Sequence, residues 1–213
     1  TTMAHVFFDL DHTLITAQSQ SLLLDTLYKN KYISFINLLR LRLFFILYKL
    51  HITPQSYLDT IFALVAKMMK DREVAPVDKL VHDFVFKTFP SIENKVAVDE
   101  LQKHIISNHT IILSSSAFEP IVKAAADYFQ IREYRCSKLE IINGKYTGKL
   151  DGLPNYGLEK LNKLLDFDFT DSYGYSDHQS DIKVLEKTTH PYAVTPTSKM
   201  ESFAVDHHWP ILK

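Results

Sequence analysis

The chain has 213 residues, of which 46% are hydrophobic, and its formal net charge at pH 7 is −1. This length can bury the core of one globular domain with an insertion, and the balanced charge gives no reason to expect a nucleic-acid partner. The single cysteine, Cys136, excludes an internal disulfide and is typical of a reducing compartment. The first residues show no charged segment followed by an apolar one, so we predict no signal peptide and a cytoplasmic location.

Glycine is scarce and unevenly placed. Neither the G-x-x-x-x-G-K-[ST] phosphate loop nor the G-x-G-x-x-G dinucleotide fingerprint occurs in the chain. Their absence disfavours a nucleotide-dependent kinase and a dehydrogenase. All the glycines lie in the C-terminal third: Gly144, Gly148, Gly152, Gly157 and Gly174.

The N-terminal half begins with a strand pattern and continues as helix. Residues 5–10 form an apolar run that predicts a buried strand. From about residue 19 to 89, apolar residues recur at three- and four-residue spacing without a glycine, which predicts helices. Within this region Thr53-Pro54 has the pattern of an N-cap followed by proline at the first helical position. A further helix is predicted over residues 92–107.

The middle of the chain carries a second strand pattern and a hairpin pattern. A β-branched run over residues 110–113 predicts a short strand that ends at Ser114-Ser115-Ser116, and a helix is expected from Glu119. The strongest turn signal is Asn143-Gly144, which predicts a hairpin over residues 139–150.

The C-terminal part again alternates the two patterns. A helix is expected from about residue 156 and a strand over residues 172–175. Two short extended stretches, at residues 192–194 and 210–212, enclose one more helix.

Strands that alternate with helices predict an α/β fold with a Rossmann-like parallel sheet covered by helices on both faces. The helical stretch between the first two strands is too long for a crossover, so we interpret it as an inserted all-helical cap. We predict a core made of residues 1–17 and 90–213 and a cap made of residues 18–89.

The most informative cluster lies at the end of the first predicted strand, where Asp9-Leu10-Asp11-His12-Thr13 follows the apolar run. Two carboxylates at i and i+2 leave the same face of an extended segment, where one can ionise while the other keeps a proton. Such a pair can hold a divalent cation, attack an electrophile and transfer a proton, as phosphoryl transfer requires. Alone, the cluster is as compatible with an N-cap or a turn, where Asp and Thr are common.

Further polar groups follow other predicted strand ends and helix starts. Ser114 comes directly after the second strand, Lys160 lies near a helix start, and Asp177 and Asp181 follow a later strand. Because the carboxyl ends of parallel strands form one crevice, we expect these groups to converge with the aspartate pair.

In this order and context the motifs resemble those of the haloacid dehalogenase superfamily of phosphohydrolases, over nearly the whole chain outside the helical insert. The cap after the first motif, the run 143–148, and the tail at 191–196 and 209–212 are similar to the phosphoserine-phosphatase-like subgroup. The stretches 174–181 and 194–196 are also similar to phosphatidylglycerophosphatase C, a member that acts on a phospholipid phosphate.

The resemblance implies a role for each acid. Asp9 would be the nucleophile that forms an aspartyl-phosphate, and Asp11 would protonate the leaving oxygen and then activate water. Because this second acid is present, a phosphatase is favoured over a dehalogenase. Mg²⁺ would be bound by the Asp9 carboxylate, the Asp11 main-chain carbonyl and Asp177. Asp181 would support the metal or its waters, although an acid there can also serve as an ordinary helix-start residue.

The resemblance also implies a phosphate-binding group. Ser114 and Lys160 would bind the transferring oxygens, and Thr13 would fix the loop beside them. Either serine after Ser114 can replace it as the donor, and Lys163 is the alternative to Lys160.

The cap has an unusual composition. Between Asp25 and Asp59 no acidic residue occurs, and basic residues are interleaved with aromatic ones. The apolar run over residues 33–50 has the length of a membrane span, but Arg40 and Arg42 at its middle would be costly in hydrocarbon. Two readings stay open: a helix that lies in the interface and faces anionic headgroups, and a buried cap helix with outward arginine stems.

Substrate choice is predicted from Gln18, Arg40 and Arg42. Gln18 stands nine residues after the predicted nucleophile, where phosphoserine phosphatases carry a glutamate for the substrate's amino group. A neutral amide binds ammonium poorly, so a phospholipid phosphate or another amphipathic phosphomonoester is favoured, with peripheral contact to the inner face of a membrane. The alternatives are a phosphatase of a small soluble metabolite such as phosphoserine, a phosphotransferase, and a non-catalytic binding protein that uses the cap.

Overall fold

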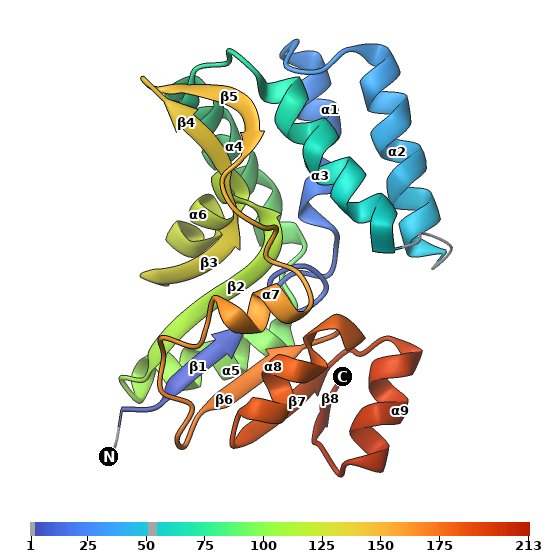
Figure 1. Cartoon of the computed structure of the whole chain (residues 1–213). Helices are drawn as coiled ribbons and strands as arrows, with labels where there is room; N and C mark the ends of the chain where they lie inside the picture. The colour runs from blue at the N-terminus through green and yellow to red at the C-terminus, as the bar shows by residue number, and fades with distance from the viewer. Residues whose placement is uncertain (1–2, 51–54) are drawn as a thin grey trace.

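The computed structural model describes residues 3–50 and 55–213 of the chain. Its main sheet has six parallel strands in the order β3-β2-β1-β6-β7-β8 (Figure 1). The predicted Rossmann-like α/β fold is therefore confirmed. The strands are β1 His5–Phe8, β2 Thr110–Phe118, β3 Glu133–Ser137, β6 Tyr173–Ser176, β7 His190–Val194 and β8 Ile211–Leu212.

The central strand β1 is apolar on both faces. Phe7 packs in a cluster with Leu164 and Val184 on one face. On the other face the ring of Phe8 stacks on that of Tyr175, with 4.4 Å between the ring centroids. Burial on both faces is what a parallel sheet imposes on its inner strands. Because β2 and β6 run parallel to β1 on either side, the residues after all three strands meet at one edge.

Helices cover both faces of this sheet (Figure 1). The helices α5 and α6 contribute to the large core cluster around Phe8 and Leu113, whereas α7 and α8 cover the face of Phe7 and Ile112. These helices and α9 are α5 Lys95–Ile106, α6 Glu119–Tyr128, α7 Leu158–Asn162, α8 Ile182–Lys187 and α9 Ser198–Asp206.

The predicted helical insert is present and has a small core of its own. Its helices are α1 Ser19–Lys29, α2 Phe35–Lys49, α3 Gln55–Met69 and α4 Val74–Thr88. Within the described ranges, no helix is long and apolar enough to cross a membrane. The predicted N-cap at Thr53-Pro54 lies outside the described residues. The buried residues of this small core are Leu24, Ile33, Leu38, Leu41, Phe44, Leu58 and Ile61.

Two sets of contacts join segments that the prediction assigns separately to the cap and to the core. The predicted hairpin forms from β4 Leu139–Ile142 and β5 Lys145–Leu150, and it hydrogen-bonds to the α3–α4 connection rather than to the main sheet. The Asp71 amide donates to the Tyr146 carbonyl at 2.9 Å, and the Tyr146 amide donates to the Arg72 carbonyl at 3.0 Å. The helix α4 in turn belongs to the large core cluster. The division at residue 89 stays a prediction.

Two parts of the sheet differ from the prediction. The strand β2 does not end at residue 113 but continues through the three serines to Phe118, because the unpredicted strand β3 pairs with it and satisfies its backbone. The pairing of Ser114 with Arg135 shows this extension, and the register shifts between Ser114 and Phe118. The polar end of β2 has no hydrophobic pattern, so the sequence predicted a strand that is too short.

Candidate active site

The loop after β1 carries both predicted catalytic acids and is closed by main-chain hydrogen bonds. The Asp9 amide donates to the Tyr175 carbonyl on β6 at 3.0 Å, and the Leu14 amide donates to the Leu10 carbonyl at 3.0 Å. His12 adopts a φ of 58° at the tight point of this loop. The loop therefore presents Asp9 and Asp11 at the carboxyl edge of the sheet.

Asp11 links this loop to the cap. Its Oδ1 accepts a hydrogen bond from the Ser19 amide at 2.9 Å, at the first residue of α1, where a helix has free amide donors. Its Oδ2 is buried and has no hydrogen-bond partner among the residues that the structure describes. Burial raises the pKa of Asp11 to about 7, although the bond from Ser19 opposes this shift. Asp11 can therefore carry a proton near neutral pH, as a general acid must.

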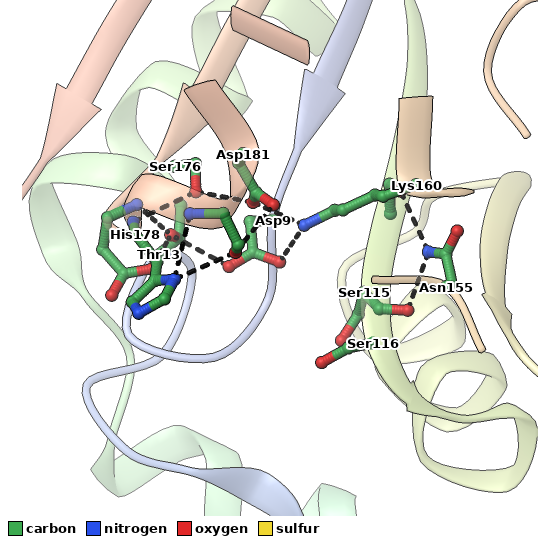
Figure 2. A network of polar contacts seen from close by, with 12 residues as sticks. Asp9, Thr13, Ser115, Ser116, Asn155, Lys160, Ser176, His178 and Asp181 are labelled. Carbon is green, nitrogen blue, oxygen red and sulfur yellow. Dashed lines mark hydrogen bonds and ion pairs between the residues drawn. The ribbon is translucent and has the colours of Figure 1, made fainter. Parts of the chain in front are cut away.

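A buried lysine connects two of the predicted acids. The Lys160 Nζ lies 2.7 Å from Asp9 Oδ1 and 2.5 Å from Asp181 Oδ2, and its side chain is only 6% exposed. Burial alone would lower the pKa of Lys160, but the charges of Asp181 and Asp9 outweigh it and raise the pKa. Burial raises the pKa of Asp9 to about 6, with Lys160 acting against it. Figure 2 shows Lys160 pointing across the site to both carboxylates.

Thr13 lies between Asp9 and Asp177, two of the predicted metal ligands. Its hydroxyl oxygen lies 3.5 Å from Asp9 Oδ2 and 3.3 Å from Asp177 Oδ1, and it accepts a hydrogen bond from the Asp177 amide at 3.1 Å. Thr13 is fully buried. Its hydroxyl therefore contacts both acids from a buried position, and its role in fixing the loop stays a prediction.

The acids fit a divalent cation. Burial, together with the charges of Asp9 and Asp181, raises the pKa of Asp177 well above its ordinary value, and Lys160 is the cation that neutralises this group of carboxylates in part. Mg²⁺ with oxygen ligands would relieve the remaining repulsion. In the part of the chain that the structure describes, no three His, Cys, Asp or Glu side chains already form a metal cluster. The predicted ligands are two carboxylates and the Asp11 main-chain carbonyl, and such a set does not require three clustered side chains.

These acids line a cavity of about 70 Å³. Thr13 and Ser114 are not among its lining residues. Figure 2 shows the two sides of the site, with Asp9 and Asp181 facing Lys160, Ser115 and Ser116. The lining residues are Asp9, Asp11, His12, Gln18, Tyr48, Ser115, Ser116, Asn155, Tyr156, Lys160, Asp177, His178, Ser180 and Asp181.

The serines are placed differently from the prediction. The Ser114 side chain is buried and its Oγ accepts a hydrogen bond from Asn155 Nδ2 at 3.2 Å, whereas the two following serines line the cavity. The Ser115 hydroxyl also accepts from the Ala117 amide at 3.1 Å. Ser114 does not follow the end of the strand, as predicted, but lies within β2, which continues to Phe118. The structure favours the alternative donors, Ser115 and Ser116.

Several lining residues were not predicted. Asn155 is fully buried, and its Nδ2 lies 2.9 Å from the Ser115 carbonyl and 3.2 Å from the Arg135 carbonyl. It thus holds the loop before α7 against β2 and β3. Tyr48 comes from the cap and Tyr156 from the same loop as Asn155. A single Asn or Tyr forms no motif by its spacing, so the sequence contained no signal for these residues.

Only one of the three predicted specificity residues reaches the site. Gln18 lines the cavity at the start of α1. Arg40 and Arg42 are exposed on α2 and lie outside the cavity, and Arg42 forms an ion pair with Asp25 at 2.5 Å. The arginines lie on the outward face of α2, because the opposite face, with Leu38, Leu41 and Phe44, packs in the small cap core.

The fold and site have counterparts among known proteins. A histidinol-phosphatase of Neisseria meningitidis is 29% identical over 122 residues, which are 53% of this chain and 55% of that protein, so the match spans about half of each. A Bordetella pertussis protein of unknown function has a solved structure with a TM-score of 0.86 at 20% identity, covering 100% of this chain and 99% of that one. A phosphoserine phosphatase structure gives a TM-score of 0.60 at 15% identity, covering 94% and 90%.

The family assignment comes from a model of haloacid dehalogenase-like hydrolases, which matches residues 6–186. This span begins in β1, ends in α8 and includes every predicted catalytic, phosphate-binding and metal-binding residue. The chain belongs to the haloacid dehalogenase-like hydrolase family and is an enzyme, as its motifs predict.

Proposed function

We propose that this enzyme is a Mg²⁺-dependent phosphatase that hydrolyses phosphomonoesters through an aspartyl-phosphate on Asp9. The observation that carries the proposal is the pairing of two buried acids with different surroundings. Asp9 is held by Lys160 at 2.7 Å, whereas Asp11 has a pKa of about 7 and an Oδ2 without a partner among the described residues. One acid is suited to attack and the other to proton transfer.

In the first step an oxygen of the Asp9 carboxylate attacks phosphorus and the bond between phosphorus and the ester oxygen breaks. Asp11 gives its proton to that oxygen, so the leaving group departs as a neutral alcohol. In the second step Asp11, now a carboxylate, takes a proton from water. The oxygen of this water attacks phosphorus and the bond to Asp9 breaks. Inorganic phosphate leaves, and both acids return to their starting states.

Other residues of the site assist by charge and position. Lys160 and Ser115 are proposed to bind the phosphate oxygens on which negative charge is spread, with Ser115 in the role predicted for Ser114. The metal would be held by the carboxylates of Asp9 and Asp177 and the carbonyl of Asp11, with Asp181 in support. When bound, Mg²⁺ supplies positive charge that offsets the repulsion between the anionic nucleophile and the anionic phosphate.

The substrate is proposed to be amphipathic, for example a phospholipid phosphate reached from an anionic membrane surface. The outward face of α2 supports this, because its exposed apolar residues are spaced three or four apart. Arg40 on α2, Lys29 at the end of α1 and Lys31 between the two helices are also exposed, and their charge complements anionic headgroups. The exposed apolar residues are Phe35, Ile36, Leu39, Leu43, Ile46 and Leu50.

The catalytic proposal is tested by measuring phosphate release from a panel of phosphomonoesters: phosphoserine, histidinol phosphate, a sugar phosphate, a nucleotide, lysophosphatidic acid and phosphatidylglycerophosphate. We expect turnover with Mg²⁺, loss of turnover with EDTA, and a fall of at least about 1,000-fold in Asp9→Asn. Turnover that persists in Asp9→Asn would contradict the proposed nucleophile. Turnover confined to soluble esters would contradict the amphipathic substrate and leave the mechanism standing.

Membrane contact is tested by sedimentation with vesicles that contain an anionic phospholipid and with vesicles of neutral phosphatidylcholine. We expect binding to the anionic vesicles only, and loss of binding when Leu39 and Leu43 are both replaced by Glu. Ile106→Glu is the matched control, because Ile106 is also an exposed apolar residue but lies on α5. Equal binding by all proteins, or self-association through α2 without vesicle binding, would contradict the proposed surface.

A further inference from the structure

A second cavity lies between the cap and the core and has an apolar wall. Its volume is about 120 Å³. Side chains of α1, α2, α3 and α4 line it from the cap, and residues around the end of β2 and the start of α6 line it from the core. Representative lining residues are Leu41, Phe44, Phe62, Val65, Met69 and Phe118. We call this space the apolar chamber.

The apolar chamber adjoins the catalytic cavity. Gln18, Tyr48, Ser116 and Tyr156 line both spaces, so these four side chains form the boundary that the two cavities share. Tyr48 lies near the end of α2 and Tyr156 just before α7, which places one tyrosine from the cap opposite one from the core. The two tyrosine side chains are hydrogen-bonded to each other, so a group bound to a phosphate at Asp9 would enter the chamber past this pair.

The wall of the apolar chamber selects against polar groups. Apart from Gln20 and the four shared residues, every lining side chain is hydrocarbon, thioether or proline. A hydroxyl, ammonium or carboxylate placed there would lose hydrogen bonds to water without replacement, which costs several kcal/mol in an apolar surrounding. Hydrocarbon has no such penalty, and apolar cavities of this kind bind small apolar molecules in preference to water.

We propose that the apolar chamber binds the hydrocarbon part of the leaving group, so that the substrate class is phosphomonoesters whose alcohol carries an alkyl chain or an apolar ring. This inference rests on the proposed phosphatase function and specifies its substrate. An engineered cavity of 150 Å³ in another protein holds benzene, so the chamber has room for roughly five carbon atoms. A longer chain would leave its remaining carbons outside the chamber.

The test is the hydrolysis of straight-chain alkyl monophosphates from methyl to octyl with Mg²⁺. We expect kcat/KM to rise about fourfold per methylene, the factor that corresponds to burial of one CH₂, as far as roughly five carbons, and then to stop rising. A series without chain-length dependence, or a preference for esters with hydroxylated alcohols, would overturn the proposal.

A variant that fills the apolar chamber makes the test specific. Val65→Phe adds a ring at the chamber wall, so we expect the ratio of pentyl to methyl phosphate turnover to fall by at least about tenfold. Val98→Phe is the matched control, because Val98 is a partly buried valine of α5 that packs in the core cluster outside the chamber. This control is expected to keep the wild-type ratio. An unchanged ratio in Val65→Phe would overturn the proposal.

A binding measurement separates this inference from the proposed function. The non-hydrolysable n-alkylphosphonates are titrated into wild-type protein and into Val65→Phe by calorimetry, with no turnover required. Affinity that rises with chain length, and does so less in Val65→Phe, supports the apolar chamber even if no phosphate is released from any ester. Affinity independent of chain length overturns the chamber as a binding site, even if phosphomonoesters are hydrolysed.

Discussion

Replacing Asp11 by Asn is predicted to stabilise the metal-free protein at pH 8 while abolishing turnover. Burial raises the pKa of Asp11 from 3.8 to about 7, so above pH 7 the folded protein must hold a buried carboxylate. A pKa difference of one corresponds to about 1.4 kcal/mol, so this charge lowers the free energy of unfolding by about 4 kcal/mol. The Asn amide keeps an oxygen for the Ser19 amide but leaves a buried NH₂ unpaired, which costs about 1–3 kcal/mol.

The net gain expected for Asp11→Asn is therefore about 1–3 kcal/mol at pH 8. The gain depends on pH in a defined direction. Because the folded pKa of Asp11 is raised, the cost of its charge is complete above pH 7 and disappears as the pH falls toward the unfolded value near 4. The variant should thus be more stable than wild type at pH 8 and lose this advantage by about pH 4.5.

The assay is urea denaturation of both proteins in EDTA at pH 4.5, 6 and 8, followed by circular dichroism. Asp206→Asn is the control, because Asp206 is an exposed aspartate at the end of α9 and its replacement should change stability little at any of these pH values. A loss of stability in Asp11→Asn at pH 8, or a gain that is the same at every pH, would refute the account of Asp11 as a buried and destabilised acid.

Two further predictions concern the residues around the acids. Lys160→Met should lower kcat/KM by at least about 100-fold. It should also destabilise the protein more at pH 8 than at pH 5, since Asp9, whose pKa burial raises to about 6, can take up a proton at the lower pH. Thermal unfolding at both pH values checks this, and an equal loss of stability would count against the ion network. Ser115→Ala should lower kcat/KM by about 10- to 100-fold, whereas the kcat/KM of Ser114→Ala should stay within about threefold of the wild-type value. Steady-state kinetics of both variants measure this, and a larger loss in Ser114→Ala would identify Ser114 as the phosphate-binding serine.

Much of the fold was predictable because local patterns and tertiary structure agree. The apolar run before Asp9 is a central strand buried on both faces, and Asn143-Gly144 forms the predicted turn with positive φ at both residues. The alternation of strands and helices predicted the parallel sheet, and the geometry of such a sheet predicted that Asp9, Lys160, Asp177 and Asp181 would meet.

The remaining features depend on contacts between distant segments. The strand β2 continues through Ser114 because β3 pairs with it, and no hydrophobic pattern in the sequence predicts that pairing. Asn155 acquires its position from carbonyls on β2 and β3. The apolar chamber exists only because the cap helices are packed on the end of β2 and the start of α6. None of these is encoded in spacing along the chain, so each required the folded structure.

The most direct test of the proposed mechanism is to look for phosphate on Asp9. The Asp11→Asn variant is mixed with Mg²⁺ and p-nitrophenyl phosphate, whose alcohol leaves without needing a proton, and the reaction is quenched in acid and digested. Because the variant lacks the group that activates water, we predict that the peptide containing Asp9 carries phosphate and that the same peptide from Asp9→Asn does not. Release of p-nitrophenol by Asp11→Asn with no phosphate on this peptide would contradict a covalent aspartyl-phosphate.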